Sequence, residues 1–338
     1  PVIQLMNPIQ GQNYYSDQLI QFSAVVTDAE DDASALSVVW TSSLDGELSL
    51  DTTIDSNNEL SDFTYLNEGN HAIEIRAEDS TGKFTTEEVV IQVGGANSLP
   101  TCSFVEPLNA EAFVVGESVV FSGLAEDADV PNNDLTVDVS SNIDGLFESL
   151  VPNSDGTFSF GFNGLSNGTH TITLLVTDEV GGDCQTSILI YVGNPPMVTI
   201  NEPLDGALYA VGESISLNAT VSDSDEPVNQ VSIVWTSDVD GELLSGNPNA
   251  QGVSQFVRSD LTAGVHALTA SATDSTGLMS DDLVSFRVNI LPVVDSIVLS
   301  PDPIYSNDTL TVAVTFSDVD GQTVTGTYAW FEDGTLTS

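Results

Sequence analysis

The chain has 338 residues, of which 51 are acidic and four are basic, giving a formal net charge of −47. Such a surface repels phosphate backbones, which excludes nucleic-acid binding, and it must be screened by salt or neutralised by bound cations. Hydrophobic residues make up 41% of the chain and alternate with polar ones, so we expect folded β-structure rather than disorder. No apolar run approaches the ~18 residues of a membrane span, and we expect no direct membrane insertion in this segment.

Four similar units follow one another along the chain. They open at Pro1, Pro100, Pro196 and Pro292, with spacings of 99, 96 and 96 residues. Each begins with a short apolar strand, and in the first three units an X-Pro pair then interrupts strand pairing. A second, alternating strand follows, and its expected inward positions are Phe22, Ala24, Val26; Phe121, Gly123, Ala125; Leu217, Ala219, Val221; and Val312, Val314, Phe316. A fixed period of this kind is typical of a tandem repeat array.

Each second strand ends in an Asp-x-acid motif. Twelve residues after its first Asp comes Trp40, Val139, Trp235 or Trp330, on a third alternating strand. Five residues further on, the first three units carry an Asp-Gly hairpin signal. A variable stretch rich in Ser and Asn leads to Leu-x-x-Gly-x-His, a strand, an Asp-x-x-Gly turn and a closing strand.

About seven short strands in about 96 residues, with no helical pattern, predict an all-β protein. We expect a linear tandem array of immunoglobulin-like β-sandwich domains. The predicted boundaries are 1–95, 100–193, 196–290 and an incomplete repeat at 292–338. Two interpretations of the incomplete repeat stay open: a fragment of a longer array, or a sheet edge that another subunit completes.

The strand and turn that contain all three histidines carry a family resemblance. GNHAIEIRAEDSTG, GTHTITLLVTDEVG and GVHALTASATDSTG resemble the sixth strand and following turn of PKD-type repeats, and YAWFEDGT is similar to that family's Trp strand and acidic-Gly turn. PKD-like and cadherin-like repeats occur in adhesins, surface layers and secreted enzymes. Val139 departs from the pattern at the Trp position, and the first three units lack a full Trp-x-Phe-Gly-Asp-Gly motif.

The acidic turns are the main candidate site. The second and sixth strands of an Ig-like sandwich run in the same direction, so the turns that follow them share one end of the domain. The first motif Asp and the sixth-strand Asp are 51 residues apart in all three complete repeats. Hard carboxylates with linker carbonyls, such as those of Asn97 or Asn194, suit Ca²⁺ at the junctions. The alternative is that each Asp only caps its own turn. The candidate metal ligands are Asp28, Glu30, Asp79; Asp127, Asp129, Asp178; Asp223, Asp225, Asp274; and Asp318, Asp320.

The remaining reactive residue types have structural interpretations. His71, His170 and His266 are isolated at a strand entry, where Ig-like folds place a Tyr that bonds back to the backbone. Cys102 and Cys184 are expected to form a disulfide between the first and last strands of repeat 2, with a free thiol as the alternative. Three sequons allow N-glycosylation or arise by chance, at Asn167, Asn218 and Asn307.

We therefore expect no enzyme and no catalytic residue. The first functional hypothesis is an extracellular rod or filament at the cell surface, such as a stalk, adhesin or fibre, cut from a longer secreted precursor and stiffened by Ca²⁺. Its partners would be further repeats, like subunits, surface glycans or proteins. The alternative is a spacer or carbohydrate-binding region of a secreted degradative enzyme.

Overall fold

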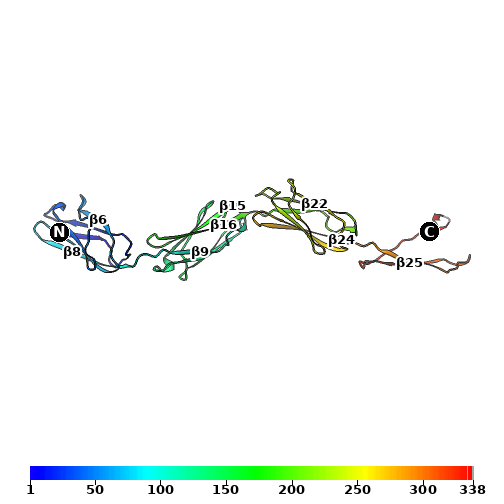
Figure 1. The fold of residues 1–338 in the computed structure, drawn as a ribbon, viewed down its shortest axis with the longest axis horizontal. Coiled ribbons are helices and arrows are strands. Elements are labelled where there is room, and N and C mark those ends of the chain that lie inside the picture. Colours follow the sequence, from blue (N-terminus) through cyan, green and yellow to red (C-terminus); the bar gives the residue numbers. More distant parts are fainter. Residues whose placement is uncertain (333, 337–338) are drawn as a thin grey trace.

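The computed structural model describes residues 1–332 and 334–336. Three β-sandwich domains lie in a row and a smaller fourth unit follows them (Figure 1). No α-helix is found among the described residues, and none of their helices could cross a membrane. Asp333, Thr337 and Ser338, which belong to the predicted fourth repeat, lie outside the described residues.

Domain 1 consists of a three-stranded sheet in the order β1-β3-β6 and a five-stranded sheet in the order β2-β8-β7-β4-β5. The chain changes sheets after Pro8, because β1 pairs with β3 whereas β2 pairs with β8 in parallel. This change splits the expected first strand in two, so the domain has eight strands instead of about seven. They are β1 (Val2–Asn7), β2 (Asn13–Tyr15), β3 (Ile20–Thr27), β4 (Ser37–Ser42), β5 (Gly46–Glu47), β6 (Glu59–Thr64), β7 (Gly69–Glu78) and β8 (Phe84–Gly94), with a short 3₁₀ helix at Ala33–Ala35.

Domains 2 and 3 repeat this topology, with sheet orders β14-β11-β9 and β10-β16-β15-β12-β13, then β17-β19-β22 and β18-β24-β23-β20-β21. The strands of domain 2 are β9 (Thr101–Glu106), β10 (Glu111–Val114), β11 (Val119–Glu126), β12 (Thr136–Ser141), β13 (Gly145–Leu150), β14 (Thr157–Phe162), β15 (Gly168–Thr177) and β16 (Asp183–Gly193), with a 3₁₀ helix at Asn132–Asp134. Those of domain 3 are β17 (Met197–Glu202), β18 (Ala207–Ala210), β19 (Ile215–Ser222), β20 (Ser232–Ser237), β21 (Gly241–Gly246), β22 (Val253–Arg258), β23 (Gly264–Thr273) and β24 (Met279–Asn289).

Each complete domain has its own core between its two sheets. The alternating residues of the second predicted strand face inward as expected, and Phe22, Phe121 and Leu217 are fully buried. Burial of one face of each sheet fixes the register, because a slip of one residue would turn the apolar set toward solvent. The fold class predicted from the sequence is therefore confirmed: tandem Ig-like sandwiches.

The Trp position is filled differently in domain 2. Trp40 packs edge-on against Phe22 at 5.4 Å, and Trp235 packs against Phe256 at 5.6 Å, between ring centroids. Val139 occupies this position in domain 2 and is fully buried. The core of domain 2 also contains a phenylalanine cluster made of Phe121, Phe147, Phe160 and Phe162.

The fourth unit is a partial sandwich. β25 (Val293–Ser300) and β26 (Thr311–Ser317) form a two-stranded sheet, and β27 (Phe331–Glu332) pairs with β28 (Thr335–Leu336). The expected alternation is present in β26, but Val312, Val314 and Phe316 are only half-buried. The third strand expected around Trp330 is reduced to Phe331–Glu332. The described residues of this unit form only these two small sheets, no residue of β25 or β26 is fully buried, and an isolated two-stranded hairpin is marginally stable.

Candidate functional site

The junctions between domains hold most of the predicted acidic residues. The second acid of the Asp-x-acid motif contacts the linker that precedes its own domain. Asp129 Oδ2 accepts the Ser98 N–H at 2.8 Å, and Asp225 Oδ2 accepts the Asn194 N–H at 2.5 Å. Asp320 Oδ2 accepts the Ile290 N–H at 2.7 Å. A carboxylate bonded to a backbone N–H is a charge-assisted hydrogen bond, so this residue clamps each linker to the next unit.

Domain 1 departs from this pattern at the same motif position. Glu30 lies exposed, and its carboxylate contacts Lys83 Nζ at 3.4 Å. An exposed ion pair of this kind contributes little to stability. The recurring Asp-x-acid motif therefore has a linker-binding role in the three later units.

The first Asp of the motif closes its own turn through Oδ1. Asp127 Oδ1 accepts the Asp129 and Val130 N–H groups at 2.9 and 3.3 Å, and Asp28 and Asp223 make the equivalent bonds. Asp127 Oδ2 and Asp223 Oδ2 are buried without a hydrogen-bond partner among the described residues.

The sixth-strand Asp is likewise a turn residue. Asp79 Oδ1 and Asp274 Oδ1 each accept two backbone N–H groups and a Thr hydroxyl. Asp178 Oδ1 accepts the Val180 and Gly182 N–H groups, and its Oδ2 accepts Asn97 Nδ2 at 2.8 Å. Asp178 therefore ties the first linker to domain 2 from a second direction. Asn97 Oδ1 stays buried without a hydrogen-bond partner among the described residues.

Among the described residues, the acids predicted to bind Ca²⁺ do not form a three-carboxylate group suited to a metal ion. Asp28, Glu30 and Asp79 do line one cavity of about 220 Å³, together with Lys83. In the described part of the chain, however, no group of three or more His, Cys, Asp or Glu side chains could hold a metal ion. The physical reason is that each Asp in a turn uses one carboxylate oxygen to accept backbone hydrogen bonds of that turn. In the later units, the second acid of the Asp-x-acid motif also points toward the linker and binds it.

The histidines form a buried lock, as the structural interpretation predicts. His71, His170 and His266 are all 0% exposed. In domain 1, Nε2 lies 2.7 Å from the Asn67 carbonyl oxygen and Nδ1 lies 2.7 Å from Ser42 Oγ. A carbonyl only accepts, so Nε2 carries the hydrogen and donates it. Ser42 Oγ already accepts the Leu44 and Asp45 N–H groups, so its hydroxyl donates to Nδ1.

The same lock recurs in domains 2 and 3. Nδ1 of His170 and His266 faces Ser141 and Ser237, at 2.7 and 2.8 Å. The predictions from the sequence missed these serines, although the signal was present: the Ser stands 29 residues before the His in every complete repeat, within Ser-x-x-Asp-Gly. The aspartate of the Asp-Gly pair adds a further hydrogen bond. Asp45, Asp144 and Asp240 accept the N–H of the residue that directly follows the Leu of Leu-x-x-Gly-x-His.

The predicted disulfide is present. Cys102 on β9 and Cys184 on β16 are bonded, with 5.9 Å between their Cα atoms. The other domains join the same strand ends with a hydrogen bond. Thr85 Oγ1 donates to the Pro1 carbonyl at 2.7 Å in domain 1, and Ser280 Oγ donates to the Pro196 carbonyl in domain 3.

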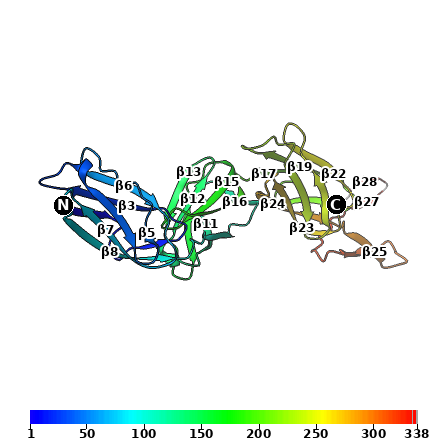
Figure 2. The ribbon, with the colours of Figure 1, turned by 60° about the vertical axis from the view of Figure 1, so that its left-hand side comes forward.

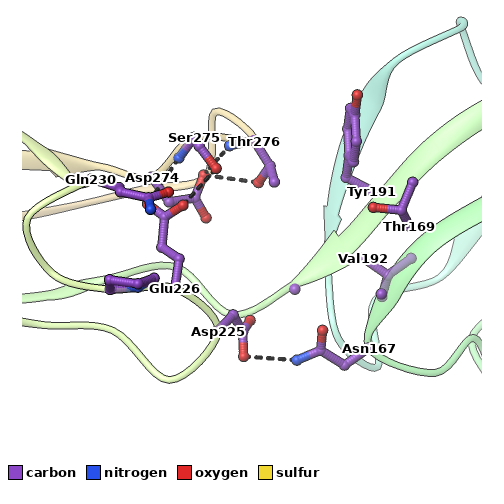
Figure 3. Close-up of a pocket in the computed structure, with 13 residues that line it drawn as sticks. Asn167, Thr169, Tyr191, Val192, Asp225, Glu226, Gln230, Asp274, Ser275 and Thr276 are labelled. Atoms are coloured by element: carbon purple, nitrogen blue, oxygen red, sulfur yellow. Dashed lines mark hydrogen bonds between the residues drawn. The ribbon is translucent and has the colours of Figure 1, made fainter.

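Direct contacts between domains differ at the two inner junctions. At the first, the Tyr15 hydroxyl donates to Glu179 across a groove of about 830 Å³. At the second, Asn167 Nδ2 donates to Asp225 Oδ1 at 2.7 Å, beside a groove of about 400 Å³ (Figure 3). The two views of the chain show the domains in sequence along one axis (Figures 1 and 2). Each junction is therefore held by a shared linker clamp and by its own side-chain bond.

The three sequon asparagines lie in different settings. Asn167 is exposed but is used in the bond to Asp225. Asn218 is half-buried on β19, and its Oδ1 accepts Asn201 Nδ2 at 2.9 Å. Asn307 is exposed in the turn between β25 and β26. A glycan on Asn167 would displace the interdomain bond.

Asp225→Ala should loosen the junction between domains 2 and 3 without unfolding either domain. The substitution removes the acceptor of the Asn194 N–H and the Asn167 amide. Because these bonds are exposed, we expect domain stability to change by less than about 1 kcal/mol. Small-angle X-ray scattering should show a broader distribution of particle lengths. Glu242→Ala, an exposed charge on β21, is the matched control. Equal scattering from both variants would contradict the clamp.

The same clamp should weaken in acid. The Asn194 N–H lowers the pKa of the Asp225 carboxyl below its ordinary value, and burial opposes this effect without cancelling it. A folded-state pKa below the unfolded value gives stabilisation that is complete above about pH 4 and is lost as the pH falls through the folded pKa. Scattering at decreasing pH should show the junction loosen, with circular dichroism to identify any domain unfolding. Asp225→Asn keeps an acceptor oxygen and should remove this pH dependence.

Comparisons with known proteins agree with the architecture. Residues 196–270 match the family model described as a bacterial Ig domain. Comparison with curated proteins gave no match. Among solved structures, the fibronectin(III)-like modules of Clostridium thermocellum CbhA are 18% identical and cover 56% of this chain and 95% of theirs, with a TM-score of 0.37.

Two other solved structures resemble this chain at a comparable sequence identity. Sidekick-1 immunoglobulin domains 1–4 are 14% identical over 85% of this chain and 76% of theirs, with a TM-score of 0.33. Bacteroides ovatus SGBP-B, solved with a mixed-linkage heptasaccharide, is 15% identical over 90% of this chain and 75% of its own, with a TM-score of 0.21. These likenesses carry no inference about function. The chain is thus a tandem array of Ig-like domains in which residues 196–270 match the bacterial Ig domain family.

Proposed function

We propose that this chain is a section of an extracellular rod, a structural or adhesive repeat protein at the cell surface. The observation that carries the proposal is the repeated linker clamp, in which Asp129, Asp225 and Asp320 each bind the backbone of the preceding linker. Linkers held in this way restrict the angle between neighbours, which a rod requires and a flexible tether does not. As part of the same proposal, we assign these Ig-like domains to the PKD-type repeats.

A non-enzymatic role is favoured by the burial of the Ser–His pairs. Ser42, Ser141 and Ser237 are at most 5% exposed and their His partners are fully buried. A nucleophile must be reached by its substrate, and each Ser hydroxyl here is already used by its His. The partners we propose are like subunits, further repeats, and surface proteins or glycans.

Small-angle scattering and electron microscopy test the rod. Three domains whose longer strands have six to eleven residues should extend over roughly 100–130 Å. We expect an elongated particle with a narrow distribution of lengths. A collapsed particle, or domains with free relative orientation, would overturn the proposal.

Calcium at the inner junctions is the second part of the proposal. Burial raises the pKa of Asp127, and the Asp129 carboxylate beside it raises that pKa further. Two adjacent carboxylates are stabilised by a shared proton or by a cation. Asp127 Oδ2 and Asn97 Oδ1 are buried and find no hydrogen-bond partner in the described part of the chain, and oxygens of this type are Ca²⁺ ligands. A bound cation here would use two carboxylates with amide, carbonyl or water oxygens.

Added Ca²⁺ should therefore raise the melting temperature of the chain and narrow its distribution of particle lengths. Calorimetry and scattering in Ca²⁺ or chelator, at equal ionic strength, provide the measurement. Mg²⁺ is the ionic control because it gives up its waters reluctantly. We expect Asp127→Asn to weaken the response. Identical melting and scattering in Ca²⁺ and in chelator would refute this part and leave the rod intact.

The groove at the first junction favours a second candidate function, glycan binding by a spacer of a secreted degradative enzyme. Tyr15 lines it together with the amides of Gln12, Gln18 and Gln92, whereas the Tyr14 ring is buried in the core of domain 1. A pocket that combines an aromatic ring with a few amide groups suits a neutral ligand such as a sugar. Binding of neutral polysaccharides in affinity electrophoresis, lost in Tyr15→Ala, would support this candidate. Unchanged mobility of the native chain in every polysaccharide would exclude it.

A further inference from the structure

The position of the disulfide determines how domain 2 would carry tension along the array. In every complete domain the load enters at the first strand and leaves through the last one, at the opposite end of the domain (Figure 1). In domain 2, Cys102 is the second residue of β9 and Cys184 is the second residue of β16. Both cysteines therefore lie at the end of the domain where the load enters.

The covalent load path through domain 2 is consequently short. It runs from Thr101 to Cys102, across the disulfide to Cys184, and then along β16 to Gly193. β16 is already an extended strand, so it has almost no length left to release. The chain between the two cysteines, with a sequence separation of 82, lies outside this path. Most of the sandwich is thus shielded from the load.

Domains 1 and 3 lack this covalent connection. The equivalent strand ends are joined by the hydrogen bonds from Thr85 to the Pro1 carbonyl and from Ser280 to the Pro196 carbonyl. Their further resistance comes from the parallel pairs β2–β8 and β18–β24, which a pull along the array shears. Once these bonds break, nothing covalent prevents the whole domain from extending.

We infer that domain 2 is an inextensible link in the array, whereas domains 1 and 3 are extensible under load. The inference rests on the proposed function in that it assigns tension to the rod. It concerns the response to force, while scattering without load tests the rod itself. The two ideas can therefore fail separately.

Single-molecule pulling on the whole chain, with handles at its two ends, tests the inference. Each extensible domain has about 90 residues and should release roughly 300 Å, at ~3.6 Å per residue less the folded length. The native, oxidised chain should show two such events. The fourth unit, with under 50 residues, is too short to give an event of this size.

The control is the double variant Cys102→Ser with Cys184→Ser. Its fully extended length should exceed that of the oxidised chain by roughly 290 Å, because the residues between the two positions join the load path. This difference in fully extended length is expected whether or not domain 2 of the variant folds. A domain that is already unfolded contributes the same extended length as a domain that unfolds under force. Dithiothreitol, which is oxidised to its cyclic disulfide as it reduces the bond to two thiols, should produce the same gain in the native chain. Three 300 Å events from the oxidised chain, or equal extended lengths of chain and variant, would overturn the inference.

Discussion

His266→Ala is expected to destabilise domain 3 by about 3 kcal/mol. The imidazole is fully buried, stacks on Phe286 with 4.9 Å between ring centroids, and joins Ser237 to the Thr262 carbonyl. Its removal leaves a cavity, and it also leaves a buried hydroxyl and a buried carbonyl without their partner. Urea denaturation followed by tryptophan fluorescence should show the Trp235 part of the transition move to lower urea. The Trp40 part, which comes from domain 1, should not move.

Val265→Thr is the matched control for this substitution. Val265 is the neighbouring strand residue and is 50% exposed, so a nearly isosteric substitution there should cost little stability. If His266→Ala unfolded at the same urea concentration as this control, the lock would contribute nothing to stability. His71→Ala should likewise destabilise domain 1, because Ser42 and Asn67 repeat the hydrogen bonds of the lock.

Loss of the disulfide is expected to destabilise domain 2 by about 4 kcal/mol. Cross-linking two positions with a sequence separation of 82 removes conformational entropy from the unfolded chain, and the double variant Cys102→Ser with Cys184→Ser restores it. The serine hydroxyls could at best form the kind of hydrogen bond that Thr85 and Ser280 make in the other domains.

Domain 2 can be followed separately because it has no tryptophan. Circular dichroism reports all domains, whereas the fluorescence of Trp40 and Trp235 reports domains 1 and 3. The double variant should therefore show an early transition in circular dichroism, with an unchanged fluorescence transition. Coincident transitions at the native position in both signals would refute the predicted loss.

The fold was largely predictable because its signals are local and repeated. Alternation on the second strand gave the buried face of Phe22, Ala24 and Val26, and the spacing of the prolines gave the order of units. The role of the histidine followed from its isolation at a strand entry. Its partners Ser42, Ser141 and Ser237 were missed, since a fixed distance of 29 residues becomes a contact only when β4 and β7 pair.

The predicted metal ligands show what a pattern in sequence leaves undecided. The three acids of a junction come to the same end of the domain, as topology requires. Whether they face one another depends on the direction of each carboxylate, and three hydrogen bonds decide this at the second junction. Asp223 bonds to its own turn, Asp274 bonds to its own turn, and Asp225 bonds to the Asn194 N–H. The sequence cannot distinguish a carboxylate that binds a cation from one that binds the backbone, because both uses need the same residue at the same position.

The sequence by itself predicted the tandem Ig-like architecture and the burial of the histidines, because both follow from a pattern that repeats in each domain. It also favoured the pairing of Cys102 with Cys184, because these two cysteines lie on the first and last strands of one repeat. Only the tertiary structure decided how neighbouring domains are joined. Hydrogen bonds from Tyr15 to Glu179 and from Asn167 to Asp225 join neighbouring domains. A pattern that repeats within one domain does not predict which residues of two neighbouring domains will meet. Such contacts depend on the relative orientation of two folded bodies, which is set by linker geometry and by side chains far apart in the chain.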